Sequence, residues 1–363
     1  MDRHYLSDSA TAEVVAQLHQ EDLKIQDDFG CRGLTYWFDG KRKTAFCLIE
    51  APSKEALKKM HDHAHGEVPN MIIEVNADIV ESFLGRIEDP VKSQNTELNI
   101  INDPAFRTIM VTSLKWVSLK NKATNTFASF IQNYNNLIAN SIAKFNGRLV
   151  QHKQGYILTS FDSVTNAILC ATEMHEAYEK ISDKTHDAEV KLKIGLSAGV
   201  PVTQKEQIFE DTIKVAEYLC DVVKGQIVVS SEVKDLYESE NLNVSIDKKS
   251  IHALNPTDEK FLSSLMDFTE KEWSNTALSA DGFSKSLGYS KSQLYRKMIS
   301  ITGKSPNTFI KEYRLQRALN LLNKKDENIA QIAFETGFNS PAYFSKCFHE
   351  LFGVLPSAYL KIS

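Results

Sequence analysis

The sequence predicts a multidomain protein, with an α+β domain at the N-terminus, an α/β domain in the middle and an all-α domain at the C-terminus. A chain of 363 residues is longer than one ordinary core requires. Two polar stretches with little periodicity, at 88–97 and at about 246–258, look like linkers. Beyond the second stretch, alternating strand and helix patterns give way to helices alone. We therefore expect domains over 1–88, 104–246 and 258–363.

The composition indicates a cytoplasmic globular protein. Hydrophobic residues make up 42% and charged residues 25% of the chain, which excludes a disordered chain. The sequence contains neither an apolar run of membrane-spanning length nor a signal-peptide pattern, so no membrane partner is expected. Five scattered cysteines argue against a disulfide framework or a zinc ribbon.

Charge is distributed unevenly along the chain. Residues 280–363 contain 12 Lys/Arg and 6 Asp/Glu, whereas the whole chain has a net charge of −5. A basic end on an acidic body fits a nucleic-acid surface, although a solvated charged surface would give the same count.

The first segment alternates strand-like and helical patterns. A hairpin signal at Asp39-Gly40-Lys41 joins two strand-like runs. The order β-α-β-β-α-β predicts a small ferredoxin-like domain. The expected helices cover 12–28 and 53–65, and the expected later strands cover 34–38, 44–49 and 71–75.

The middle segment follows a similar plan and predicts an α/β sandwich with a mixed sheet. Its expected strands are 108–112, 148–152, 156–160, 190–198 and 226–230. Its expected helices are 124–145, 163–180 and 208–223.

The third segment repeats a pattern of short helix, turn and second helix. Ser279 begins a short helix that ends at Gly288, and Ser290 with Gln293 forms a capping box for a helix ending at Gly303. A long helix, 305–323, leads to the second copy. There 328–336 is the short helix, 337–339 is the turn, and Ser340-Pro341 opens the last helix. Two such helix-turn-helix units can enter successive major-groove segments of double-stranded DNA.

This end of the chain resembles the AraC/XylS family of transcription regulators. The matching residues are 287–288, 292–297, 302–306, Ile332, Ala333, Gly337, Phe338, Ser340, Tyr343, Phe344, Lys346, Phe348, Gly353, Pro356 and Tyr359. His349 departs from the family, which usually has a basic residue there, and the resemblance therefore implies a weaker phosphate contact at this position. Six residues are expected in the core: Leu287, Leu294, Ile332, Phe338, Phe344 and Phe348.

The resemblance implies two kinds of DNA contact. Residues in the N-terminal halves of the recognition helices should meet base edges: Lys291, Ser292, Gln293 and Arg296 in the first helix, and Ala342, Tyr343 and Lys346 in the second. Other residues should position phosphates: Ser290, Lys297, Lys304 and Ser340. Tyr343 could equally be a packing residue.

Residues 107–231 resemble the class III nucleotidyl cyclase domain. The matching pieces are 107–112, 134–138, 145–148, 160–163, 194–199 and 225–230. The two metal-binding carboxylates of that family correspond here to Ser113 and Gln154, and its Asn and Arg fall near Ile213 and Glu217. Because neutral groups cannot hold two metal ions on a triphosphate, we expect no enzyme activity. Dimerisation, small-molecule binding, signal relay and a plain spacer remain open.

Residues 1–87 resemble a small ferredoxin-like family described as nickel-binding. The matching pieces are 1–4, 34–39, 46–53, His61, His65, Gly66, 68–69 and 73–75. His61 and His65 lie four residues apart on one helix face, so both imidazoles can reach one metal, and His4 is a candidate third ligand. Nickel or another divalent transition metal would suit these ligands. Surface histidines with no metal, or an organic effector, are the alternatives.

Together these features predict an effector-responsive DNA-binding transcription regulator that acts as a homodimer. A metal-storage protein and an active nucleotidyl cyclase are the competing functions; the lost carboxylates argue against the second.

Overall fold

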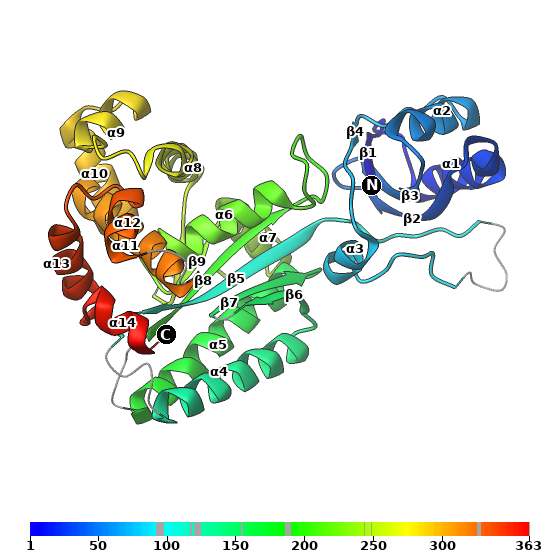
Figure 1. The fold of residues 1–363 in the computed structure, drawn as a ribbon. Helices are drawn as coiled ribbons and strands as arrows, with labels where there is room; N and C mark the ends of the chain where they lie inside the picture. Colours follow the sequence, from blue (N-terminus) through cyan, green and yellow to red (C-terminus); the bar gives the residue numbers. More distant parts are fainter. Residues whose placement is uncertain are drawn as a thin grey trace.

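The computed structural model describes residues 1–91, 98–116, 118–119, 125–153, 155–185, 190–242, 244–247, 249–324 and 328–362. The N-terminal domain and the helical C-terminal domain lie at opposite ends of a central sheet (Figure 1). The multidomain plan expected from the sequence is therefore confirmed.

The N-terminal domain has the predicted β-α-β-β-α-β order. Its elements are β1 (Asp2–Tyr5), α1 (Ala12–Ile25), a 3-10 turn at Gln26–Phe29, β2 (Arg32–Asp39), β3 (Thr44–Glu50), α2 (Lys54–Ala64) and β4 (Met71–Ile72). The antiparallel sheet has the order β2-β3-β1-β4, which is the ferredoxin-like arrangement. A further helix, α3 (Ala77–Leu84), was not expected from the sequence.

The two faces of this first sheet have different neighbours. Alternation along β2 and β3 directs Tyr36 and Cys47 into the core under α1 and α2, while Trp37 and Phe46 enter a second core. That second core also contains Ile109 of the middle domain. The N-terminal sheet is thus packed on both faces, and one face is shared with the middle domain.

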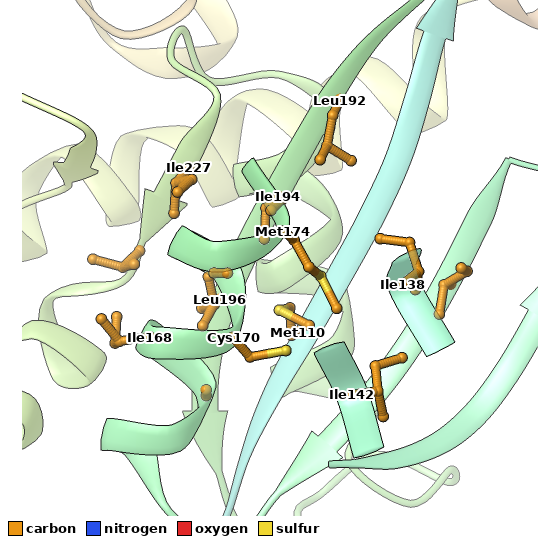
Figure 2. Packing of buried hydrophobic residues seen from close by; sticks show 14 of the residues in the cluster. Met110, Ile138, Ile142, Ile168, Cys170, Met174, Leu192, Ile194, Leu196 and Ile227 are labelled. Atoms are coloured by element: carbon orange, nitrogen blue, oxygen red, sulfur yellow. The ribbon is translucent and has the colours of Figure 1, made fainter. Parts of the chain in front are cut away.

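The middle domain is built on a six-stranded mixed sheet of order β10-β9-β8-β5-β7-β6. Its strands are β5 (Arg107–Trp116), β6 (Arg148–Lys153), β7 (Tyr156–Phe161), β8 (Val190–Gly199), β9 (Ile227–Val229) and β10 (Ile251–Ala253). Its helices are α4 (Asn125–Lys144), α5 (Val164–Thr185), α6 (Glu210–Asp221) and α7 (Ser231–Glu240). Residues of α4, α5 and α7 form one apolar core with the sheet, where Met110, Ile138 and Met174 meet (Figure 2).

The other face of the sheet carries α6 at close range. A Cβ atom added at Gly195 would lie 2.2 Å from the backbone oxygen of Ala216 and 2.5 Å from the backbone nitrogen of Cys220. Only glycine lets the helix lie this near to β8.

The expected linker at 246–258 differs from the structure. Residues 251–253 form β10, which pairs in parallel with β9, and the next helix begins at Pro256. A three-residue edge strand has too little local pattern to be distinguished from a loop in the sequence. The other expected linker lies mainly outside the described residues, since only 88–91 of it are described.

The C-terminal domain consists of seven helices in the described residues: α8 (Pro256–Glu272), α9 (Ala280–Leu287), α10 (Lys291–Thr302), α11 (Pro306–Lys324), α12 (Ile329–Glu335), α13 (Pro341–Phe352) and α14 (Pro356–Ile362). The capping box of Ser290 and Gln293 is present. Ser279 occupies the N-cap of α9 but forms no side-chain capping hydrogen bond. A second box, formed by Asn328 and Gln331, begins α12. In the described part of the chain, no helix has the length and apolar character needed to cross a membrane.

Candidate metal centre and nucleic-acid interface

A buried group of histidines and aspartates lies between β1, α1 and α2. His61 is only 1% exposed, and both of its ring nitrogens face carboxylates. Its Nε2 lies 3.1 Å from Asp2 Oδ2, and its Nδ1 lies 3.0 Å from Asp22 Oδ1. His65 Nε2 is 3.2 Å from the same oxygen of Asp22. The helical spacing does bring His61 and His65 together, as the sequence predicted, and α1 adds a carboxylate.

His4 belongs to a neighbouring set of donors. Two sets of three residues have ligand atoms within 4.8 Å of one another: Asp2, His4 and Cys47, and Asp22, His61 and His65. The His4 and His61 rings are 5.0 Å apart, so the two sets adjoin. The structure therefore places His4 beside the expected pair and not in the same three-ligand set.

The electrostatics of the cluster favour a positive charge at its centre. Burial alone would raise the pKa of Asp2, but His4 and His61 hold that pKa far below its ordinary value. Burial would lower the pKa of His61, yet Asp2 and Asp22 raise it to about 9. Without a metal, His61 is thus an imidazolium between two carboxylates.

These donors fit a divalent transition metal. Imidazoles with carboxylates are suitable ligands for nickel, copper and zinc. The buried Nε2 of His4 has no hydrogen-bond partner among the described residues. A bound cation would take over the positive charge now supplied by the proton on His61, so binding should release protons. Burial raises the pKa of Cys47 well above its ordinary value, so the protonated thiol is the weakest donor present.

Asp2 and Asp22 were not among the residues predicted from the sequence. Asp2 could have been found from strand alternation, because it lies two residues before His4 and therefore faces the same side of β1. Asp22 comes from α1, and its approach to α2 is a tertiary contact with no local signal. The two remaining histidines of this domain lie outside both sets: His63 is exposed, and His19 is buried beside Asp89 at 3.5 Å.

The first helix-turn-helix unit presents most of the predicted DNA-contacting residues to solvent. Lys291, Ser292, Gln293 and Arg296 are exposed on the N-terminal half of α10, while Leu294, Met298 and Ile301 are buried beneath it. Lys291 Nζ lies 2.7 Å from Asp281 on α9. Ser290, also exposed, accepts the backbone N–H of Gln293 through its hydroxyl.

Two lysines expected to position phosphates also form ion pairs within the protein. Lys297 pairs with Asp258 of α8 and lies over the Phe261 ring. Lys304 Nζ is 2.6 Å from Glu312 Oε2 on α11. The contact of Lys297 with α8 is a tertiary contact that has no local signal in the sequence.

The second unit has the same layout. On α13, Ala342, Tyr343 and Lys346 are exposed, with Tyr343 55% exposed. Ser340 caps the helix by accepting the N–H of Tyr343 at 3.3 Å.

The residues of both units that were expected in the core are buried, except for Leu287, which is partly buried against the core of the first unit.

The structure places three of the four positions expected from the sequence to correspond to cyclase active-site groups. Ser113 is 7% exposed within β5, and Ile213 packs beside the core shared with the N-terminal domain. Glu217 accepts a hydrogen bond from Tyr156 at 2.8 Å, and burial raises the pKa of its carboxyl group. Gln154 lies outside the described residues.

Comparison with known proteins identifies both ends of the chain. Residues 283–362 match the model of a helix-turn-helix domain family. The C-terminal region is an AraC-type helix-turn-helix domain. Residues 1–75 match the family described as nickel responsive protein SCO4226-like. This chain therefore joins an AraC-type domain to a domain similar to nickel-responsive proteins.

The curated relatives each match only part of this chain. The transcriptional regulator MtrA of Neisseria gonorrhoeae is 32% identical over 97 residues, which cover 27% of this chain and 31% of MtrA. The histidine kinase P4 of Formosa agariphila is 41% identical over 102 residues, 28% of this chain and 7% of the kinase. This chain thus spans well under two thirds of these two relatives. An adenylate/guanylate cyclase/hydrolase structure from Silicibacter pomeroyi aligns with a TM-score of 0.33 and 22% identity, covering 38% of this chain and 83% of that one.

Proposed function

We propose that this protein is a sequence-specific transcription regulator whose DNA affinity responds to a divalent transition metal, nickel first, bound in the N-terminal domain. The proposal rests on one observation. A buried cluster of three histidines and two aspartates occurs in the same chain as two helix-turn-helix units with exposed recognition helices.

The exposed residues of α10 and α13 supply the readout. Arg296 suits guanine and Gln293 suits adenine, while Tyr343 and Lys346 face the second half of the site. Ser290 and Ser340 are at helix N-termini, where phosphate oxygens are favourably received. Lys297 and Lys304 contribute to DNA binding only if their internal ion pairs open.

Strand β1 connects the metal cluster directly to the middle domain. Asp2 and His4 face the cluster, while the alternate residues Met1 and Arg3 face the middle domain. Arg3 donates to the backbone oxygen of Val202 at 3.1 Å. A cation that repositions Asp2 therefore also moves groups packed against the middle sheet.

The long strand β5 connects the N-terminal region to the DNA-binding domain. Its first residue, Arg107, donates to the backbone oxygen of Leu84 in α3, and its last residue, Trp116, packs against the core of the second unit. Metal binding can change DNA affinity only if the DNA-competent arrangement and the other arrangement bind the metal with different affinities.

The test is to measure metal content and DNA affinity together. Untagged protein is analysed for nickel, zinc and copper, then titrated with nickel while binding to its own upstream DNA is followed. We expect stoichiometric metal and a changed dissociation constant. Both should be lost in His61→Ala/His65→Ala and retained in His63→Ala, an exposed histidine of the same helix. Metal binding with unchanged DNA affinity would instead favour a storage role.

We also propose that the middle domain is not catalytic and that the regulator is a homodimer. The neutral Ser113 and the hydrogen-bonded Glu217 support the first point, since neither site offers a free metal-binding carboxylate. Light scattering of the full chain tests the second.

A further inference from the structure

A cavity of about 820 Å³ lies between the middle domain and the DNA-binding domain. Residues of β5, β8 and α6 line one side, and residues of α8 and α11 line the other. We propose that it binds a small aromatic molecule carrying a phosphate or carboxylate group. This organic effector site is separate from the metal cluster and goes beyond the function proposed above. The volume is within the usual range for small-molecule sites.

The carboxylates that line the cavity are already satisfied by the protein. Asp221 pairs with Lys115 at 2.7 Å, and Glu312 pairs with Lys304 at 2.6 Å. Glu217 and Glu270 each accept a tyrosine hydroxyl, at 2.8 and 3.1 Å. Asp221 and Glu312 are therefore neutralised by lysines, whereas Glu217 and Glu270 have a neutral hydroxyl as partner and keep their negative charge.

Three lining cations, Lys193, Lys224 and Arg317, have no carboxylate at ion-pair distance in the described part of the chain. Lys193 of β8 donates to the backbone oxygens of Val223 and Gly225. Burial, with Lys115 and Lys304 nearby, lowers the pKa of Lys193 to about 8. An anion beside this ammonium would stabilise its charged form. Arg317 of α11 donates to the Tyr313 hydroxyl and lies over the Tyr313 ring. These three cations outnumber the two unpaired carboxylates, and they come from both domains.

Aromatic and uncharged polar groups make up much of the remaining lining. Trp116, Tyr218 and Tyr313 offer ring faces and edges. Tyr134 is 1% exposed and lines the cavity, and its hydroxyl lies near the side chain of Thr112 without a well-formed hydrogen bond among the described residues. A polar group on a ligand would give this buried hydroxyl a better partner. A planar ring with an acidic group meets these requirements together.

The location gives such a ligand access to both DNA-reading units, because α11 connects them. If the protein is the regulator proposed above, occupancy should also change DNA affinity. Ligand binding itself does not depend on that role and is measured without DNA.

Isothermal titration calorimetry of the full chain tests the site. The probes are adenosine 5′-monophosphate and benzoate, with adenosine, inorganic phosphate and acetate as partial ligands. We expect at least one aromatic anion to bind with a dissociation constant below about 1 mM, and the partial ligands to bind on the order of tenfold more weakly. Preference for the monophosphate would identify a phosphate ligand, and preference for benzoate a carboxylate ligand.

Variants assign the binding to this cavity. Lys193→Met and Arg317→Met should each weaken it on the order of tenfold, because each removes one charged donor. Lys180→Met, an exposed lysine on α5, should leave it unchanged. Thermal unfolding confirms that each variant is folded, and Arg317→Met keeps the test valid should Lys193→Met fail to fold. The proposal is overturned if neither aromatic anion binds, if a partial ligand binds equally well, or if both cavity variants bind normally.

Discussion

The two helix-turn-helix units share a plan but are attached to the rest of the protein in different ways. The core of the first unit contains Leu294 and Met298 of α10 together with Tyr218, Leu219 and Val222 from α6. The core of the second unit consists of its own residues and receives Leu119 from the middle domain, with Trp116 packed alongside. The first unit thus shares its apolar core with the middle domain, whereas the second contacts the middle domain mainly through Leu119 and Trp116.

Each unit also accepts one backbone hydrogen bond from the middle domain. The N–H of Lys224 donates to the oxygen of Ile301 in the first unit, and the N–H of Leu119 donates to the oxygen of Phe352 in the second. Since the core of the second unit includes only Leu119 of the middle domain among the described residues, this unit should separate from the middle domain more easily. A signal that reaches the end of β5 would then act mainly on the spacing between the two units.

The largest expected effect comes from the shared core of the first unit. Leu219 is fully buried, so Leu219→Ala should lower the free energy of unfolding by about 2–5 kcal/mol. The loss should affect the middle domain and the first unit together, because both contribute to this core. Urea denaturation and amide hydrogen exchange measure the total and its distribution.

Leu119→Ala is the matched change in the second unit. Leu119 is also fully buried, but its loss should increase exchange only in α12 to α14 and leave α9 and α10 protected. Equal deprotection of both units by either variant would show that they are attached alike, contrary to our comparison.

The turn glycines give the next largest effect. Gly288 and Gly337 both have a positive φ, +71° and +78°. An added methyl group meets nothing within 4 Å at Gly288, but at Gly337 it lies 2.9 Å from Arg314 Nε and from the Ser274 backbone oxygen. Arg314 cannot move freely, because its guanidinium donates to the backbone oxygens of Trp273 and Asn275, both at 2.7 Å.

Gly288→Ala should therefore cost about 1 kcal/mol from backbone strain alone, and Gly337→Ala about 2–4 kcal/mol from strain and the clash. Thermal unfolding of the two variants compares them directly. A larger loss in Gly288→Ala would mean that the first turn is the more tightly packed one.

Local signals in the sequence predicted much of the C-terminal domain. The Ser290 capping box and the Ser340-Pro341 start depend on neighbouring residues, and both are present. In contrast, β10 exists only through its pairing with β9, and the partner of Lys297 comes from α8. In the metal cluster, helical spacing found His61 and His65, but Asp22 required the packing of α1 on α2. The unpredicted features therefore depend on contacts between elements far apart in the sequence.

DNA affinity should separate the roles of the two recognition helices. Arg296→Ala and Lys346→Ala should each weaken specific binding by about 1–3 kcal/mol, each relaxing preference in a different half of the site. Lys58→Ala, which removes an exposed charge from the distant α2, is the control and should have no effect. Fluorescence anisotropy with mutated operators checks this. Loss of preference at the same bases in both variants would contradict separate readout by the two units.

The smallest effect should come from the helix caps. Ser290 takes part in a two-way box with Gln293, whereas Ser340 accepts one backbone N–H and precedes a proline that fixes the first turn. Removing either hydroxyl by alanine should cost about 1 kcal/mol. The loss of unfolding free energy should be greater for Ser290→Ala, because the hydrogen bond from the Ser290 N–H to the Gln293 side chain should weaken as well.

Since α10 begins with its DNA-facing residues, Ser290→Ala should also reduce DNA affinity at temperatures where the protein is still folded. Circular dichroism with parallel DNA titrations measures both quantities; if Ser340→Ala were the more harmful, the proline would not compensate for the weaker cap.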